Sequence, residues 1–105
     1  GCKTKTDGVR SSYLYQTSDT NGTTMEVVDA AQTVLTDYEL TDVNGKSDKL
    51  KGEAKGIMVD GTKVWVTTER VTDTTSTTSV QVGKLGDNAL GQEILGKIKL
   101  ELANN

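Results

Sequence analysis

The side chains that could do chemistry in this chain are carboxylates, hydroxyls and one thiol, because the sequence contains no histidine. Histidine is the most frequent general base and metal ligand in proteins, and a single cysteine cannot build a zinc site. Paired carboxylates could bind Ca²⁺ or perform glycosidase chemistry. However, four aspartates fall in predicted turns, where aspartate is common for structural reasons, and no calcium-loop spacing is present. We therefore predict a protein that is not an enzyme, with no catalytic residue, no metal site and no cofactor. The aspartates concerned are Asp42, Asp48, Asp60 and Asp73.

Two polar stretches could also carry chemistry. The stretch TDTTSTTS (72–79) offers hydroxyl nucleophiles, but no general base accompanies them, and we interpret it as a solvated hairpin loop or edge. The stretch GKLGD (83–87) precedes a predicted helix and could present backbone N–H groups to an anion. It lacks the Gly-Lys-Ser or Gly-Lys-Thr of a phosphate loop. We interpret it as a turn followed by a helix with Asp87 as its N-cap.

Three aromatic side chains form the candidate binding surface. Tyr13 and Tyr15 share one face of a predicted strand, and Trp65 lies on the strand face opposite Val64 and Val66. If the rings face outward, they form an aromatic patch of the kind that binds a partner or a carbohydrate. The alternative is that the rings fill the core and the valines face solvent, because a register shift of one residue exchanges the two faces. The sequence alone leaves both alternatives open.

Length and composition predict one folded domain. The chain has 105 residues and a net charge of −3, its pI is 4.8, and it has no basic stripe, so we expect no nucleic-acid partner. No apolar run approaches the roughly 20 residues that a membrane-spanning helix needs. We place a single domain at 11–103. We interpret the polar, aperiodic residues 1–10 as a flexible tether.

Two amphipathic helices and five strands account for the domain. Thr23 and Glu26 have the spacing of a capping box at the start of the first helix. The order β-α-β-β-β-β-α, with one apolar stripe on each helix, predicts an α+β two-layer sandwich. In this fold class, two helices pack on one face of a mostly antiparallel sheet, and the other face can stay solvated. The helices are predicted at 23–38 and 88–103, the strands at 11–18, 38–43, 50–59, 62–71 and 78–83, and the turns at 44–48, at Asp60-Gly61 (type I′) and at 72–78.

The second predicted helix contains two glycines, Gly91 and Gly96. A glycine inside a helix costs about 1 kcal/mol relative to alanine. We expect both glycines to permit close packing of this helix on the sheet.

The segment VQVGKLGDNALGQEILGKIKLEL (80–102) resembles the C-terminal signature of a group of small bacterial lipoproteins of unknown function. That signature is roughly V-x-V-G-x-x-G-D-x-x-L-x-x-x-I-L-x-x-I. In the family a helix, a strand and a hairpin precede it, and the helix at 23–38 and the hairpin VDGTKVWV (59–66) occupy those places here. The resemblance implies a location in the bacterial envelope and supplies no catalytic residue. The matching positions are Val80, Val82, Gly83, Gly86, Asp87, Leu90, Ile94, Leu95 and Ile98.

The dipeptide Gly1-Cys2 is similar to the end of a bacterial lipobox, where a signal peptide is cut before the cysteine and its sulfur receives a diacylglycerol. Each buried CH₂ of such a lipid contributes about 0.8 kcal/mol, so two or more acyl chains hold a domain on a membrane. Lys3 after the cysteine resembles outer-membrane sorting. The other alternative for Cys2 is an incidental terminal residue.

From the lipobox and the family resemblance we expect a protein that is lipid-anchored through Cys2 on the periplasmic side of the bacterial outer membrane. Its domain would bind or scaffold a partner in envelope integrity or assembly, with peptidoglycan or an envelope protein as the partner. The alternative is a small periplasmic inhibitor or ligand-binding module, since several small protease inhibitors also pack a helix across an antiparallel sheet.

Overall fold

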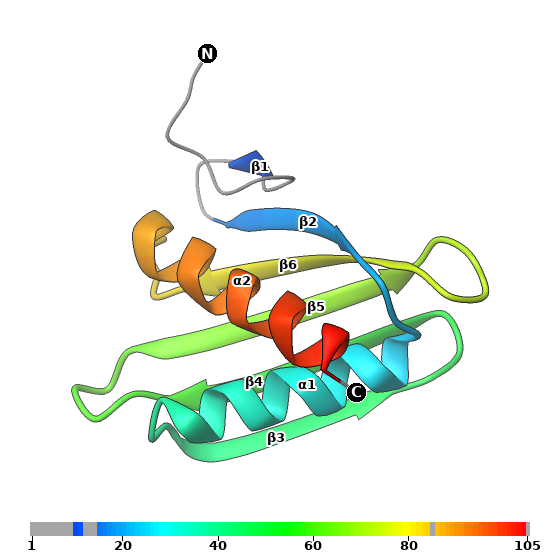
Figure 1. Ribbon diagram of the computed structural model, residues 1–105. Helices are drawn as coiled ribbons and strands as arrows, with labels where there is room; N and C mark the ends of the chain where they lie inside the picture. Colours follow the sequence, from blue (N-terminus) through cyan, green and yellow to red (C-terminus); the bar gives the residue numbers. More distant parts are fainter. Residues whose placement is uncertain (1–9, 12–14, 85, 105) are drawn as a thin grey trace.

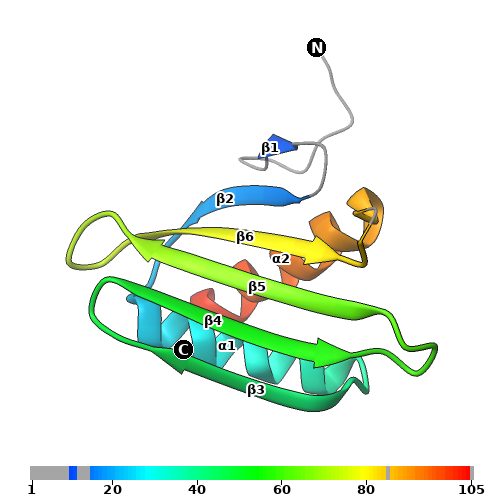
Figure 2. The same ribbon diagram turned by 180° about the vertical axis from the view of Figure 1, so that it is seen from behind.

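The computed structural model describes the backbone of residues 10, 11, 15–84 and 86–104. Its strands form one antiparallel sheet in the order β1-β2-β6-β5-β4-β3 (Figure 1). Both helices lie on the same face of this sheet, and the view from behind shows the other face in front of them (Figure 2). The predicted α+β sandwich is therefore confirmed. Its elements are β1 (Arg10–Ser11), β2 (Gln16–Thr20), α1 (Thr24–Asp37), β3 (Thr41–Ser47), β4 (Lys51–Ile57), β5 (Lys63–Arg70), β6 (Ser76–Val82) and α2 (Asn88–Ala103).

The short strand β1 was not predicted as a separate element. It crosses the boundary that we placed between the tether and the domain, and its Arg10 and Ser11 pair with Thr17 and Gln16 of β2. The rest of the predicted tether, residues 1–9, lies outside the described residues. From β2 to α2, the order of elements is the predicted one.

The ends of the helices follow the predicted capping residues. The Thr23 side chain accepts a hydrogen bond from the Glu26 backbone N–H at 3.2 Å, and the Thr23 backbone N–H donates to Glu26 Oε1 at 2.9 Å. This reciprocal pair is a capping box. Asp87 accepts from the backbone N–H of Leu90 at 3.1 Å, so it is the N-cap of α2. Further along, the Tyr38 hydroxyl at the end of α1 donates to Glu93 of α2.

Two glycines let α1 approach the sheet closely. A Cβ atom on Gly45 would lie 2.7 Å from Val28 Cγ1, and one on Gly52 would lie 2.6 Å from Val28 Cγ2. Both distances are far below an ordinary van der Waals contact, so the Val28 side chain fills a slot that only glycine leaves open on β3 and β4. The predicted turn at 44–48 is therefore wrong: Gly45 lies inside β3, and the chain turns at 48–50. Gly45 serves helix packing rather than a turn.

The turn between β3 and β4 is built on Asp48. Its Oδ1 accepts from the backbone N–H groups of Leu50 at 2.8 Å and Lys51 at 3.0 Å. These two hydrogen bonds hold the pKa of Asp48 below its ordinary value, because they stabilise the charged form. The Thr24 hydroxyl of α1 donates to the Asp48 carbonyl at 2.5 Å, which ties the helix N-terminus to this turn.

The hairpin between β4 and β5 differs from the predicted type I′ turn. A type I′ turn needs a positive φ at both central residues, whereas in this loop only Gly61 has one, at +92°. Met58 N–H donates to the Thr62 carbonyl and Gly61 N–H donates to the Met58 carbonyl, both at 2.8 Å. This is a three-residue loop, in which a type I turn is followed by a left-handed glycine. The Asp60 carboxylate accepts from the Thr62 N–H at 2.9 Å and stabilises this loop.

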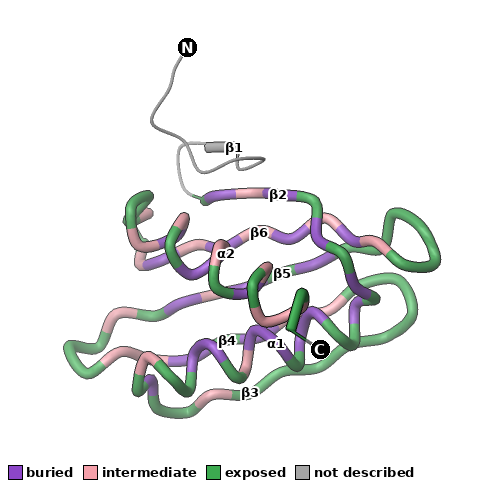
Figure 3. The backbone as a smooth tube through the Cα atoms, viewed as in Figure 1, coloured by how far each residue is buried: buried purple, intermediate pink, exposed green. Residues whose placement is uncertain are grey.

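Between the layers, the core has an apolar part and a part rich in hydroxyl groups. The inward side of β6 consists of Ser76, Thr78, Val80 and Val82, all buried (Figure 3). The valines lie against the aliphatic side chains of the helices and of β5. The hydroxyl-rich part contains seven buried polar residues: Gln16, Ser18, Thr20, Thr24, Thr68, Ser76 and Thr78.

The buried hydroxyls form a connected chain of hydrogen bonds. Thr78 Oγ1 lies 3.1 Å from Thr68 Oγ1 and 2.9 Å from Thr20 Oγ1, and Thr20 Oγ1 also donates to the Ser76 carbonyl at 2.9 Å. Ser76 Oγ donates to the Gly22 carbonyl at 2.8 Å. Buried hydroxyls are tolerated when they are hydrogen-bonded. The predicted turn is therefore wrong for 76–77, which lie in β6 together with the predicted strand at 78–83, and the expectation of a solvated stretch is wrong for the buried Ser76 and Thr78.

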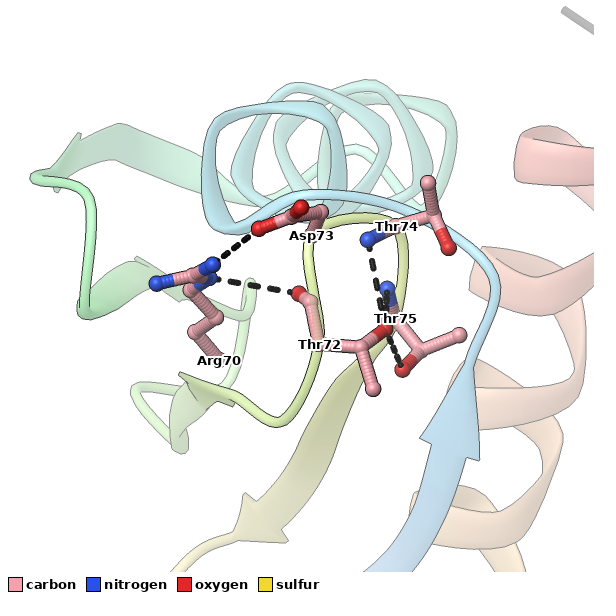
Figure 4. A network of polar contacts seen from close by, with 5 residues as sticks. All are labelled: Arg70, Thr72, Asp73, Thr74 and Thr75. Atoms are coloured by element: carbon pink, nitrogen blue, oxygen red, sulfur yellow. Dashed lines mark hydrogen bonds and ion pairs between the residues drawn. The ribbon is translucent and has the colours of Figure 1, made fainter.

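The remaining part of that polar stretch, residues 72–75, lies in the turn between β5 and β6. Thr72 Oγ1 accepts from the backbone N–H groups of Thr74 at 3.2 Å and Thr75 at 3.1 Å (Figure 4). Such a hydroxyl-to-backbone motif stabilises tight turns. Arg70 pairs with Asp73 across the same turn, so the local sequence accounts for the geometry of this loop.

Candidate binding face

The structure places two of the four predicted site residues on one surface. Cys2 and Tyr13 lie outside the described residues. Tyr15 is 44% exposed, and Trp65 is half-buried on the side of β5 opposite Val64 and Val66. Both valines are buried against the helices. Of the two alternatives that the sequence left open, the outward one therefore holds for Trp65.

This surface is the side of the sheet that the helices do not cover, and we call it the open face. It is formed by the strands β2, β6, β5, β4 and β3 (Figure 2). It is open because both helices have a single apolar stripe and pack on the other side, where the strands present small and aliphatic side chains. Residues on the open face are intermediate or exposed, and they alternate with buried residues along β2, β5 and β6.

The open face contains a hollow of about 890 Å³. The pairing of strands aligns three of its lining residues. Trp65 of β5 pairs with Gln81 of β6, and the pairing of Gln16 with Val80 brings Tyr15 level with Gln81 on the other side. Neighbouring strands lie about 4.8 Å apart, so the backbone positions of Tyr15 and Trp65 lie about 10 Å apart. The lining includes Tyr15, Lys46, Lys51, Glu53, Trp65, Thr67, Glu69, Thr77, Ser79 and Gln81.

The side chains of the hollow are polar and carry nearly balanced charge. Three carboxylates and two ammonium groups line it. Two opposite pairs face each other across strands, with Lys46 beside Glu53 and Lys51 beside Glu69. Cross-strand pairs of opposite charge contribute roughly 0.2–1 kcal/mol each, and they leave the surface with little net charge.

The backbone of the open face is already occupied by hydrogen bonds. The strands β6, β5 and β4 each pair with a neighbour on both sides. A molecule on this face therefore meets side chains rather than free N–H and C=O groups. Some of these side chains are positioned by further bonds: Gln81 Nε2 donates to the Gly83 carbonyl at 3.1 Å. The hydroxyl of Ser79 lies 2.9 Å from that of Thr17 on β2.

The sequence did not identify the β6 residues of this site. Ser79 and Gln81 lie in the strand predicted at 78–83, and Thr77 lies in the predicted turn, but none of the three was named as a site residue. The signal that could have found them is the alternation in STTSVQV, because threonine is favoured in strands. Extending the alternation of Val80 and Val82 backward assigns Thr77 and Ser79 to the outward face.

A second hollow, of about 610 Å³, lies where the N-terminus of α1 meets the turns at 48–50 and 71–75. Three strongly exposed apolar side chains belong to these segments. Met25 is 64%, Leu50 66% and Val71 61% exposed, and the Arg70 N–H donates to the Leu50 carbonyl at 2.8 Å, which joins the two turns. The segments at this end thus carry three exposed apolar side chains, and this hollow shares Ser47 and Asp48 with the hollow of the open face.

Two further observations concern the described part of the chain. No group of three histidine, cysteine, aspartate or glutamate side chains gathers there in a way that could hold a metal ion. Neither helix described is long and apolar enough to cross a bilayer.

The fold and the site define a small α+β two-layer domain with one helix-covered face and one open, polar sheet face. A family model matches residues 13–101 of the chain, which include α1, α2 except for its last two residues, and the sheet from β2 to β3. The chain belongs to this family, described as Protein of unknown function (DUF3568). A comparison with curated proteins finds no match.

Proposed function

We propose that this chain is a bacterial envelope protein, anchored by a lipid on Cys2, that works by binding a partner through the open face rather than by catalysis. One observation carries the binding role. Six antiparallel strands expose a face on which Tyr15, Trp65 and a row of polar side chains border a hollow of about 890 Å³. Exposed aromatic residues that border a hollow mark interaction sites.

The location of the protein rests on the sequence. The Gly1-Cys2 dipeptide is similar to a lipobox, and the segment at 80–102 resembles the signature of small bacterial lipoproteins. An anchor of two or more acyl chains would keep the domain near a membrane. The partner would then be a component of the envelope, with the outer membrane as the favoured location because of Lys3.

The experiment that tests this function is site-specific photo-cross-linking in the native cells. A benzophenone amino acid replaces Thr67, which is exposed in the centre of the hollow. The matched control carries the same group at Thr33, which is exposed on α1. Benzophenone inserts into C–H bonds of any neighbouring molecule, so adducts are sought in both the protein and the cell-wall fractions. We expect adducts from position 67 well above those from position 33, and equal yields at the two positions would contradict the proposal.

A second candidate function is inhibition of an envelope protease by the loop end. The observation that favours it is the grouping of Met25, Leu50 and Val71 on segments that meet around the second hollow. Protease inhibitors bind with exposed loops rather than with a sheet face. The same cross-linker at Leu50 separates the two functions: adducts from position 50 without adducts from position 67 would favour the inhibitor.

A further inference from the structure

We infer that the ligand of the open face is an uncharged oligosaccharide chain, with sugar rings lying against Tyr15 and Trp65 and hydroxyl groups bonded to the polar side chains between them. This inference rests on the proposed function, since it names the chemical class of the partner that the open face binds. It is argued from the spacing of the rings, the chemistry of the side chains between them, and the charge of the hollow.

The two aromatic side chains are placed for an extended ligand. Tyr15 and Trp65 are separated by one strand, with Gln81 between them, so their backbone positions are about 10 Å apart. That separation leaves room for a ligand of more than one sugar ring, with one ring lying against each aromatic side chain. Tyrosine and tryptophan combine an apolar ring with a polar group, which suits a sugar with an apolar C–H face and hydroxyl edges.

The side chains between and beside the rings are hydrogen-bonding groups on regular strands. Thr67 and Ser79 pair across β5 and β6 in the centre of the hollow, and Glu53 pairs with Thr67 from the other side. Hydroxyls and carboxylates are acceptors, and hydroxyls are also donors, so together they can bind the hydroxyl groups of a sugar. Because these residues lie on paired strands, little backbone freedom is lost on binding.

The charge of the hollow disfavours charged polymers. Asp48, Glu53 and Glu69 oppose Lys46 and Lys51 in its lining, and the whole chain has a net charge of −3. Nucleic acids and anionic polysaccharides bind to surfaces with a strong positive charge. A surface with mixed and nearly cancelling charge is complementary to a ligand without net charge.

The same lining disfavours a protein as the ligand. The centre of a protein interface is depleted of charged residues and enriched in aromatic residues and methionine, whereas Glu53 and Glu69 lie in this hollow. Among the described residues that line it, none is leucine, isoleucine, valine or methionine. A peptide that adds a strand would need a free sheet edge, and the central strands β5 and β6 have none.

The test is direct binding to defined tetrasaccharides. Trp65 is the single tryptophan of the chain, so its fluorescence reports on a ligand at the open face without a label. The probes are chitotetraose, cellotetraose and maltotetraose, with a hyaluronan tetrasaccharide as the anionic comparison. We expect a saturable change in fluorescence with at least one uncharged probe and no comparable change with the anionic one.

Variants then locate the site by isothermal titration calorimetry. We expect Trp65→Ala and Tyr15→Ala each to weaken binding about tenfold or more, a loss of about 1.4 kcal/mol, and Tyr15→Phe to retain most of the affinity. Met25→Ala, which alters an exposed apolar side chain away from the hollow, is the control with unchanged affinity. Trp65 is half-buried, and the exposed Tyr15 therefore provides a second variant in case Trp65→Ala does not fold, with circular dichroism as the check.

The outcomes separate this inference from the function on which it rests. The inference that the ligand is an uncharged oligosaccharide would be overturned by any of three results. No uncharged probe binds, only the anionic probe binds, or Tyr15→Ala and Trp65→Ala leave the affinity unchanged. If a protein is then cross-linked from position 67, the open face is a binding surface with another class of ligand. If position 67 gives no adduct above position 33 either, the proposed function fails as well.

Discussion

At the scale of single residues, the two glycines of α2 have different structural roles. A Cβ atom on Gly91 would lie 3.1 Å from Gln16 Cγ and 3.6 Å from the Val80 carbonyl oxygen, whereas one on Gly96 would meet no atom within 4 Å. Gly91 therefore permits the close approach of α2 to β2 and β6, as predicted for both glycines. For Gly96 that prediction is wrong, because its side of the helix faces away from the sheet.

This difference leads to a paired prediction. Gly96→Ala should raise the free energy of unfolding by about 0.5–1 kcal/mol, because alanine loses less backbone entropy in a helix. Gly91→Ala should raise the free energy of unfolding by less than this, or lower it. The gain from alanine's helix preference is offset there by the tight contact of the new Cβ with Gln16. Urea unfolding followed by Trp65 fluorescence measures both. Equal stabilisation by the two variants would show that α2 does not pack closely at Gly91.

At the scale of elements, the Val28 side chain packs helix α1 closely against the sheet edge in a slot between two glycines. Val28 is 5% exposed, and Gly45 of β3 and Gly52 of β4 leave room for its two methyl groups. The edge strand β3 has no buried residue of its own. Its contact with α1 therefore depends on glycine, where a strand of ordinary sequence would use aliphatic side chains.

The slot predicts coupling between α1 and β4. Gly52→Ala should destabilise the domain by about 1–3 kcal/mol, the usual range for an overpacked core. Combining it with Val28→Ala should destabilise the domain by less than the sum of the two single changes, because the smaller side chain makes room for the new methyl group. Lys55→Ala, at an exposed position of the same strand, is the control. Additive losses in urea unfolding would contradict the slot.

At the scale of the whole molecule, the two faces of the sheet have different roles. The helices and the helix side of the sheet form the core, and the open face remains available to solvent (Figure 2). An anchored domain that binds a partner needs a surface that neither its own core nor its attachment to a membrane occupies. Cys2 belongs to a polar segment that precedes the domain in sequence, and the proposed lipid would be attached there.

The anchor is tested on protein from its own cells. After phase separation with detergent, we expect the protein in the detergent phase, and we expect its N-terminal peptide to be heavier by a diacylglyceryl group on Cys2. Cys2→Ser should move the protein to the aqueous phase, because the sulfur that carries the lipid is lost. An unmodified Cys2 in the aqueous phase would remove the anchor and favour the inhibitor or ligand-binding module.

Much of the fold follows from residues that are close together in the sequence. The capping box of Thr23 and Glu26, the N-cap Asp87 and the apolar stripes of both helices depend on contacts within a few residues. The alternation of Val64, Trp65 and Val66 likewise marks the two faces of a strand. Local patterns of this kind determine the elements and their order, and together with one apolar stripe per helix they determine the two-layer architecture.

Only the tertiary structure decided what the ambiguous residues do. The sequence predicts Gly45 as a turn residue, whereas in the structure Val28 of α1 lies against it, and it predicts Ser76 as part of a turn, whereas the Ser76 hydroxyl is buried and donates to the Gly22 carbonyl. The side of the sheet on which Trp65 lies was likewise open. Alternation of side chains along a strand identifies two faces, but it does not say which face the helices cover. In each case the deciding contact joins residues that are far apart in the sequence. Such a contact forms, and stabilises the fold, only when the helices pack on the sheet.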